Sequence, residues 1–259
     1  MLKGKTALVT GSTSGIGLAM ARALAREGAN IVLNGFGDAA TLAAVEREIQ
    51  SLGVQTLYHG ADMSKPAEIE DMMRAAAARF GGVDVLVNNA GIQYVSPIEN
   101  FPPERWDAII AINLSSAFHT IRLALPAMKQ ANWGRIINIA SVHGLVASVD
   151  KSAYVAAKHG IVGLTKAVAL ETATTGVTCN AICPGWVLTP LVQKQVDARA
   201  ARDGLTNDAA KRSLLAEKQP SQDFVTADQL AALALFLCSD AGAQVRGAAW
   251  NMDGGWYAQ

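Results

Sequence analysis

The sequence predicts an α/β fold in which a doubly wound parallel sheet carries helices on both faces, and three observations lead to this prediction. Short apolar runs alternate with longer amphipathic stretches along the 259 residues. Several of these stretches end at glycine, which commonly closes a helix. No Pro/Ser-rich linker, repeat or low-complexity segment separates them. We therefore expect a single domain over residues 1–259, with a more polar helical excursion at about residues 189–219.

The individual elements follow from their apolar spacing. The expected strands are short apolar runs at Thr6–Thr10, Ile31–Leu33, Thr56–His59, Val83–Val87, Ile136–Ile139, Val177–Ile182 and Ala248–Met252. The expected helices have apolar residues three and four apart, at Ser14–Glu27, Ala40–Leu52, Pro66–Phe80, within Pro102–Met128, and at Ala153–Thr172, Leu191–Lys218 and Ala227–Ser239. This alternation predicts a mostly parallel sheet with both faces covered.

Composition excludes several classes of protein. Hydrophobic residues make up 51% and charged residues 17% of the chain, which excludes a disordered protein. Basic and acidic residues number 22 each, so we expect neither nucleic acid nor an anionic membrane as partner. The chain has no uninterrupted apolar run long enough to span a membrane.

The expected compartment is the cytoplasm. Residues 1–5 lead straight into the first strand pattern without the apolar region of a signal peptide. The three cysteines, Cys179, Cys183 and Cys238, have apolar neighbours, which favours buried, reduced thiols. A disulfide between the first two is the minor alternative. We expect no metal site, since no His or Cys cluster completes a ligand set.

A glycine-rich loop follows the first expected strand. Gly11, Gly15 and Gly17 let the backbone turn tightly and approach a ligand closely. The exposed N–H groups and the positive end of the following helix dipole suit a pyrophosphate. The spacing is GxxxGxG, so a tight βα turn without a ligand is the alternative. The place after the first strand of an alternating chain favours a dinucleotide.

The residues near this loop favour NAD over NADP. A 2′-phosphate usually requires Arg or Lys near the loop or the end of the second strand, and neither is present there. The acid that normally binds the ribose hydroxyls is also missing from the strand end. Asp38 is the nearest, and it either takes that role or caps the next helix. Phe36 either flanks the adenine or packs inside.

A tyrosine and a lysine lie one helical turn apart. Tyr154 and Lys158 project from one face of an expected helix. A nearby ammonium stabilises a phenolate, so we expect a tyrosine pKa below its usual value of about 10 and acid/base work on an alcohol. Ser141 and the run Asn88–Gly91 follow two strands whose carboxyl ends meet at one edge of the sheet. The three features converge on one site.

These motifs resemble the classical short-chain dehydrogenase/reductase family, which has a single-domain Rossmann-type fold. The matching stretches are Thr10–Gly17, Asn88–Gly91, Ser141, Tyr154–Lys158 and Pro184–Gly185, in the family's order and over most of the chain. The resemblance implies that Tyr154 is the acid/base and that Ser141 holds the substrate oxygen. It also implies that Lys158 holds the nicotinamide ribose and that Asn113 completes a proton relay through water.

The resemblance also implies a cofactor site. Asp62 would bind the adenine, and Thr189 would reach the nicotinamide carboxamide. The residues expected at the cofactor are Gly11, Thr13, Ser14, Gly15, Ile16, Gly17, Phe36, Asp62, Met63, Asn89, Ala90, Gly91, Tyr154, Lys158, Pro184, Gly185, Val187 and Thr189.

The residues that flank these motifs suggest a small acidic substrate. A cation, a histidine and two amides suit a carboxylate, and two tryptophans limit the room. Each residue has a plainer alternative: Lys151 as solvated surface, His143 as a backbone partner, the tryptophans as core or subunit contacts, the glutamines as exposed. The residues expected at the substrate are Gln93, Ser141, His143, Lys151, Tyr154, Trp186, Gln195 and Trp256.

Longer stretches are similar to the bacterial D-3-hydroxybutyrate dehydrogenase branch of the family. They are Leu33–Asp38, Asn89–Gln93, Ser141–Ser148, Lys151–Tyr154, Ala181–Val187 and Glu217–Pro220. This resemblance implies NAD use, interconversion of a small hydroxy acid and its keto acid, a homotetramer, and a substrate lid in the helical segment after Thr189. Two alternatives remain: the same chemistry on another small alcohol or a 3-oxoacyl substrate, and a non-catalytic dinucleotide sensor.

Overall fold

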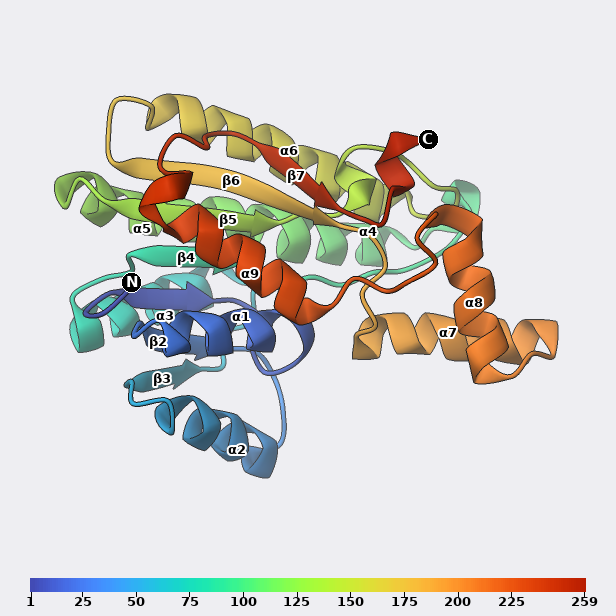
Figure 1. Ribbon diagram of the computed structural model, residues 1–259, viewed down its shortest axis with the longest axis horizontal. Helices are drawn as coiled ribbons and strands as arrows, with labels where there is room; N and C mark the ends of the chain where they lie inside the picture. Colours follow the sequence, from blue (N-terminus) through green and yellow to red (C-terminus); the bar gives the residue numbers. More distant parts are fainter.

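A parallel sheet of seven strands forms the centre of the computed structural model, which describes residues 1–259 (Figure 1). The strands are β1 (Thr6–Val9), β2 (Asn30–Asn34), β3 (Thr56–His59), β4 (Val85–Asn88), β5 (Gly134–Ile139), β6 (Val177–Pro184) and β7 (Ala249–Met252). Their order in the sheet is β3-β2-β1-β4-β5-β6-β7, and every pair is parallel. The order reverses between β1 and β4, where open α/β sheets bind ligands.

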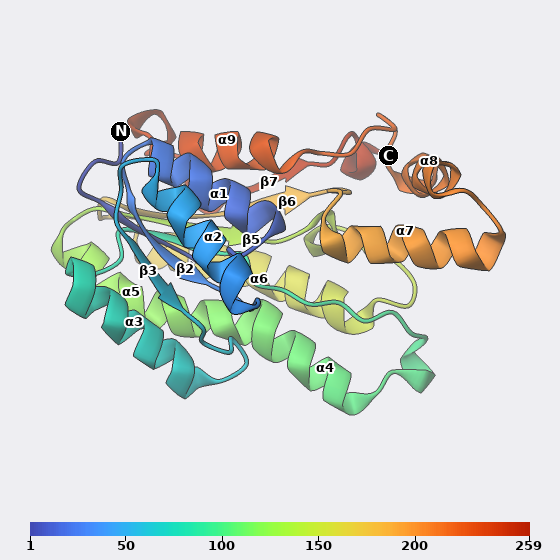
Figure 2. The same ribbon diagram turned by 90° about the horizontal axis from the view of Figure 1, so that it is seen from below.

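Helices cover both faces of the sheet (Figure 2). One face carries α1 (Gly15–Arg26), α2 (Ala39–Gln50) and α9 (Ala227–Cys238), and the other carries α3 (Pro66–Phe80), α4 (Pro103–Ile110), α5 (Ser116–Gln130) and α6 (Ser152–Glu171). Neighbouring strand residues point to opposite cores: Ala7 and Val9 join the core beneath α1 and α9, while Leu8 joins the core beneath α3 and α5. The predicted doubly wound α/β fold is confirmed.

The expected helical stretch Pro102–Met128 is divided. A π-helical turn, Ala111–Ser115, joins α4 to α5. The span Pro103–Gln130 is long and apolar enough to cross a membrane by composition alone. In the fold, however, α5 packs against α3 and β4, so this span is a core element.

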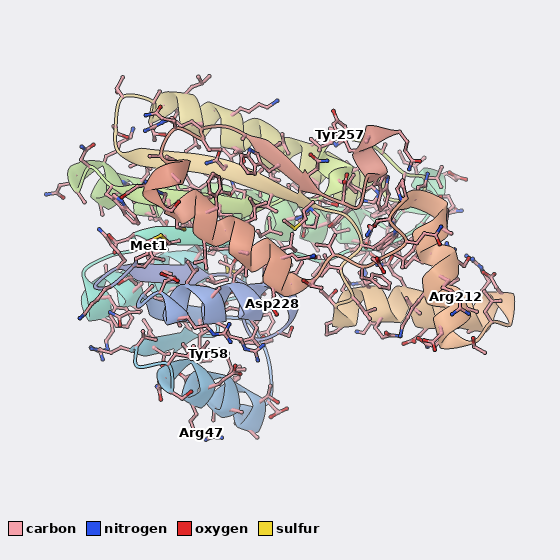
Figure 3. All side chains as sticks on the ribbon, in the orientation of Figure 1. Met1, Arg47, Tyr58, Arg212, Asp228 and Tyr257 are labelled. Atoms are coloured by element: carbon pink, nitrogen blue, oxygen red, sulfur yellow. The ribbon has the colours of Figure 1, made fainter.

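Two further helices form the expected excursion after β6. They are α7 (Pro190–Asp203) and α8 (Asn207–Lys218), separated by a left-handed turn at Gly204 (φ +64°). Figure 1 shows both lying beyond the carboxyl ends of the strands, on the same side as the C-terminus. Arg212 on α8 and Tyr257 in the C-terminal turn mark this end in Figure 3. We call α7 and α8 the lid.

The three cysteines are free and buried. Cys179 and Cys183 both lie on β6, four residues apart along an extended strand, so the alternative of a disulfide between them is not realised. No group of three or more His, Cys, Asp or Glu side chains comes together in a way that could hold a metal ion.

Candidate active site

The glycine loop leaves the amino end of α1 open to an anion. Gly11 and Gly15 adopt left-handed backbone angles (φ +64° and +57°), which bring the loop tightly from β1 into the helix. Ser14 is the N-cap residue but makes no side-chain capping bond, and the first turn contains no acidic residue. The N–H groups of this turn therefore have no side-chain partner and suit a pyrophosphate.

A cavity of about 370 Å³ lies beside this loop at the carboxyl ends of the strands. Seventeen of the eighteen residues expected at the cofactor line it: Gly11, Thr13, Ser14, Gly15, Ile16, Phe36, Asp62, Met63, Asn89, Ala90, Gly91, Tyr154, Lys158, Pro184, Gly185, Val187 and Thr189. The structure thus brings together residues from five strand ends and from α6. Its size and position fit a dinucleotide.

Gly17 is the residue of that set that does not line the cavity. A methyl group at this position would collide with the carbonyl oxygen of Gly11 and with the side-chain amide of Asn89. That amide donates to the carbonyl oxygens of Thr10 and Gly11, at 2.8 and 3.1 Å. Gly17 therefore allows α1 to approach the loop closely, and its contact with a ligand is indirect.

The structure decides between the alternative roles of Asp38 and Phe36 at the end of the cavity near β2. Asp38 caps α2, with its carboxylate oxygens 2.8 and 2.9 Å from the N and Oγ1 atoms of Thr41, and it does not line the cavity. Phe36 lines the cavity and is 69% exposed, so the alternative of a packing residue is excluded. The only cationic side chain in the cavity wall is Lys158.

Asn34 at the end of β2 is a structural residue that the sequence motifs did not identify. Its Oδ1 accepts from the Gly11 N–H at 3.3 Å, and its Nδ2 donates to the carbonyl oxygens of His59 and Ala61 at 3.1 and 3.0 Å. The buried amide ties the glycine loop to β3. A polar residue directly after the apolar run Ile31–Leu33 was the available indication.

Tyr154 and Ser141 line both this cavity and a second, smaller one. Helix α6 carries Tyr154 and Lys158 one turn apart, and the Lys158 Nζ lies 5.5 Å from the centre of the Tyr154 ring. The Lys158 ammonium also donates to the carbonyl oxygen of Ile139 at 2.7 Å, which holds it at the end of β5. The two cavities therefore meet at a hydroxyl pair.

The expected lowering of the tyrosine pKa is not what this arrangement produces. Burial raises the pKa of Tyr154 to about 12, against a hydrogen bond with Ser141 that lowers it. Burial also lowers the pKa of Lys158 to about 8. Desolvation disfavours both the phenolate and the ammonium, and it is the largest influence on the pKa of each group. A further positive charge in the cavity would favour the phenolate.

Asn113 lies in the π-helical turn before α5 and is buried. Its Oδ1 accepts from the N–H of Ile92, and its Nδ2 donates to the carbonyl oxygen of Ile92, both at 2.9 Å. Asn113 lines neither cavity. Because its side chain is engaged in holding the segment after β4, only the main chain remains for the expected relay. π-Helical turns frequently mark functional sites.

The smaller cavity, of about 70 Å³, adjoins Ser141 and Tyr154 on the lid side. All eight residues expected at the substrate line it: Gln93, Ser141, His143, Lys151, Tyr154, Trp186, Gln195 and Trp256. They come from the segments after β4, β5 and β6, the start of α6, the lid and the C-terminal turn. Sequence reasoning missed Leu191 and Val192, which line both cavities from the first turn of α7.

Lys151 is the cation of this cavity. It is 9% exposed, which excludes the alternative of a solvated surface residue. Its Nζ lies 4.9 Å from the ring centre of Trp186 and forms no salt bridge. Burial lowers the pKa of Lys151 to about 8, while the charge of Glu217 raises it. An unpaired, desolvated ammonium is a strong site for a carboxylate.

The His143 side chain is buried between two serines. Its Nε2 lies 2.9 Å from the Ser148 Oγ, and its Nδ1 lies 3.4 Å from the Ser141 Oγ. Burial, followed by the positive charge of Lys151, lowers the pKa of His143 to about 3, so the ring is neutral. Both ring nitrogens therefore lie near serine hydroxyls, and the alternative that His143 only hydrogen-bonds the backbone is not realised.

The remaining walls are amides and indoles. The Gln195 Nε2 on α7 donates to the Gln93 Oε1 at 3.2 Å, which joins the lid to the segment after β4. The Trp186 and Trp256 rings lie 5.6 Å apart and are both buried. The arrangement therefore places polar donors and an apolar wall around one small space.

Fold and site together define a dinucleotide-binding α/β protein. A sequence profile of the short chain dehydrogenase family matches residues 5–200. The chain belongs to this family, which uses a nicotinamide dinucleotide. It is 72% identical over 259 residues, all of both chains, to the D-beta-hydroxybutyrate dehydrogenase of Cupriavidus necator. It is 60% identical over 256 residues to that of Rhizobium meliloti, covering 98% of this chain and 99% of the relative.

Solved structures agree with this placement. A variant of the actinorhodin polyketide ketoreductase with NADPH superposes with a TM-score of 0.93 at 35% identity, covering 100% of both chains. Levodione reductase superposes with a TM-score of 0.91 at 33% identity, covering 100% of this chain and 99% of the other.

Proposed function

We propose that this chain is an NAD-dependent enzyme that interconverts D-3-hydroxybutyrate and acetoacetate. One observation carries the proposal: the cavity beside Ser141 and Tyr154 contains an ammonium, Lys151, that has no carboxylate partner. A short hydroxy acid satisfies this cation with its carboxylate and presents its hydroxyl to the Ser141–Tyr154 pair. The 72% identity to a D-beta-hydroxybutyrate dehydrogenase over the whole chain supports the same substrate.

In the proposed mechanism, residues of this chain bind, orient and deprotonate the substrate. Lys151 binds the carboxylate, with Gln93, Gln195 and His143 completing the polar wall. Ser141 holds the hydroxyl oxygen, and Tyr154 takes its proton. An oxidised nicotinamide bound in the larger cavity would accept the hydride from the carbon that bears the hydroxyl, and its positive charge would favour the phenolate.

Lys158 has two proposed tasks. Its ammonium binds the ribose of the dinucleotide and adds a second positive charge near the tyrosine. Asn113 stabilises the segment after β4, and we propose that its main chain completes the proton relay through water. Trp186, Trp256 and the lid over residues 189–219 exclude water from the reacting atoms.

NAD is the proposed cofactor, in preference to NADP. The wall of the larger cavity near Phe36 and Asp62 contains no Arg or Lys to bind a 2′-phosphate. The site departs from the usual NAD pattern in one respect. No carboxylate at the end of β2 is free to bind the ribose hydroxyls, since Asp38 caps α2. Main-chain groups and Phe36 would then bind the adenosine half, with Asp62 at the adenine.

We further propose a single functional unit over residues 1–259, a homotetramer, and a cytoplasmic location. Exposed large apolar side chains on the outer helices, including Phe118 on α5 and Leu170 on α6, support burial between subunits. Three free buried cysteines support a reducing compartment. Light scattering of the purified protein measures its molar mass, which should be that of four chains.

A substrate panel tests the function. Both enantiomers of 3-hydroxybutyrate, its neutral methyl ester, a sugar alcohol and a 3-hydroxyacyl thioester are supplied with NAD or NADP, and the reduced cofactor is followed by absorbance. We expect turnover of the D acid with NAD, at least about tenfold faster than with NADP because a phosphate dianion finds no cation. Equal turnover of the ester would contradict the carboxylate site. Tight NAD binding without any turnover would favour a sensor.

A further inference from the structure

Gln219 is a buried amide at the point where the lid returns to the body of the protein. It follows α8 directly and is 1% exposed. Its Oε1 accepts from the main-chain N–H of Trp186 at 2.8 Å, and its Nε2 donates to the carbonyl oxygen of Asp223. A buried amide with both ends hydrogen-bonded is a rigid connection, because breaking either bond leaves an unsatisfied polar group.

The space around this amide is filled by main chain. A methyl group on Gly185 would lie 2.5 Å from the Gln219 Oε1 and 2.8 Å from the Asp253 Cα. A methyl group on Gly254 would lie 2.7 Å from the Gln219 Cγ. Gln219 is therefore enclosed between the residue that follows β6 and the C-terminal turn that carries Trp256.

The indole of Trp186 depends on this connection. Its ring nitrogen Nε1 is buried and has no hydrogen-bond partner. The main chain, by contrast, is held on both sides, because the Trp186 carbonyl oxygen accepts from the Val225 N–H at 2.9 Å. The ring packs against Trp256, lies beneath the Lys151 ammonium and belongs to the apolar cluster that also contains Val142. No hydrogen bond fixes the ring, so its position in the substrate cavity depends on apolar packing and on the backbone that carries it.

We propose that Gln219 is a positioning residue that limits substrate length by holding the Trp186 backbone. The inference rests on the proposed function. A hydroxy acid one methylene longer than the four-carbon substrate needs the apolar wall of the cavity to retreat, and this wall contains Trp186. The backbone that carries Trp186 can move away from the cavity only if its hydrogen bond to the Gln219 Oε1 breaks. The same amide holds the C-terminal end of the lid against the body of the protein.

The test compares 3-hydroxybutyrate with 3-hydroxypentanoate in the Gln219→Met variant, which keeps the shape of the side chain and loses both hydrogen bonds. We expect kcat/KM for the shorter acid relative to the longer one to fall about tenfold, since one methylene is discriminated by roughly ten- to two-hundredfold in a closed pocket. The KM for NAD should stay unchanged. The control is Gln130→Met, at an exposed glutamine at the end of α5 that lines neither cavity. An equal loss for both acids would overturn the proposal.

The wild-type protein separates this inference from the function on which it rests. If it turns over neither acid, the proposed function fails before any variant is compared. If Gln219→Met does not fold, amide hydrogen exchange of the wild-type protein decides. The Trp186 N–H should exchange far more slowly than the Leu191 N–H in the first turn of α7, which has no intrahelical acceptor. Equal exchange rates would contradict the proposal that Gln219 holds the Trp186 backbone.

Discussion

The two cavities of this protein differ in what lines them: mostly backbone in the larger one and mostly side chains in the smaller one. Glycines, strand ends and the open amino end of α1 form most of the larger cavity, so its chemistry belongs to the backbone. Side chains from the lid, the C-terminal turn and three strand ends form the smaller one. A backbone site changes little when side chains differ, whereas a side-chain site changes with each substitution. This explains how family members share a cofactor site and differ in substrate.

The two cavities share Ser141 and Tyr154, so the largest effect is expected there. Tyr154→Phe should lower kcat roughly a thousandfold, because the acid/base group is lost. NAD affinity, measured by fluorescence titration, should change less than about twofold, since most of the larger cavity is backbone. Retained turnover would reject the assignment of Tyr154 as the acid/base.

Lys151 belongs to the smaller cavity alone, and its removal should separate the two regions. Lys151→Ala should raise the KM for 3-hydroxybutyrate about a hundredfold, because the carboxylate loses its charged partner. The KM for NAD should remain the same. Lys194→Ala, an exposed lysine on α7, is the control and should change neither. A parallel rise in both KM values would show that the regions are not independent.

The pH dependence sharpens the comparison further. Burial lowers the pKa of Lys151 to about 8, so the ammonium that binds the carboxylate is present below this pH and is lost above it. The KM for 3-hydroxybutyrate should therefore rise up to about tenfold per pH unit above pH 8. In Lys151→Arg this rise should vanish, since a guanidinium stays charged. A rise that persists in the arginine variant would assign the titration to another group.

The smallest effect is expected from the glycine that shapes the larger cavity without lining it. Gly17→Ala forces α1 away from the Gly11 carbonyl and the Asn89 amide. We expect a loss of about 1–3 kcal/mol in the free energy of unfolding, as for other overpacked positions, measured by thermal denaturation. The KM for NAD should rise severalfold while the KM for 3-hydroxybutyrate stays constant. An unchanged melting temperature would contradict the close approach.

Most of the fold was predictable because the apolar periodicity is regular. Residues Ala7, Leu8 and Val9 alternate between two cores, and a parallel sheet covered on both faces is the arrangement that buries them all. The division of the stretch Pro102–Met128 by a π-helical turn was not predictable, since the apolar spacing continues through it. The Asn113 side chain forms bonds there to a segment 21 residues away.

The pKa values and hydrogen-bond partners of the site residues were less predictable than which residues line the site. Lys158 was expected to lower the pKa of Tyr154, yet burial is the largest influence on the pKa of both groups. Asp38 had two equally reasonable roles until Thr41 was found to occupy both carboxylate oxygens. Spacing indicates which residues meet, and solvent exclusion, which depends on every surrounding element, determines their charge.

The sequence by itself determined the sheet, the glycine loop and the helix that carries Tyr154 and Lys158, because each depends on local spacing and chain order. Only the tertiary structure decided that Lys151 is a buried cation, that Gln219 holds Trp186, and that Gly17 packs without lining a cavity. These facts depend on contacts between segments far apart in the chain, and burial is a property of the whole packed molecule.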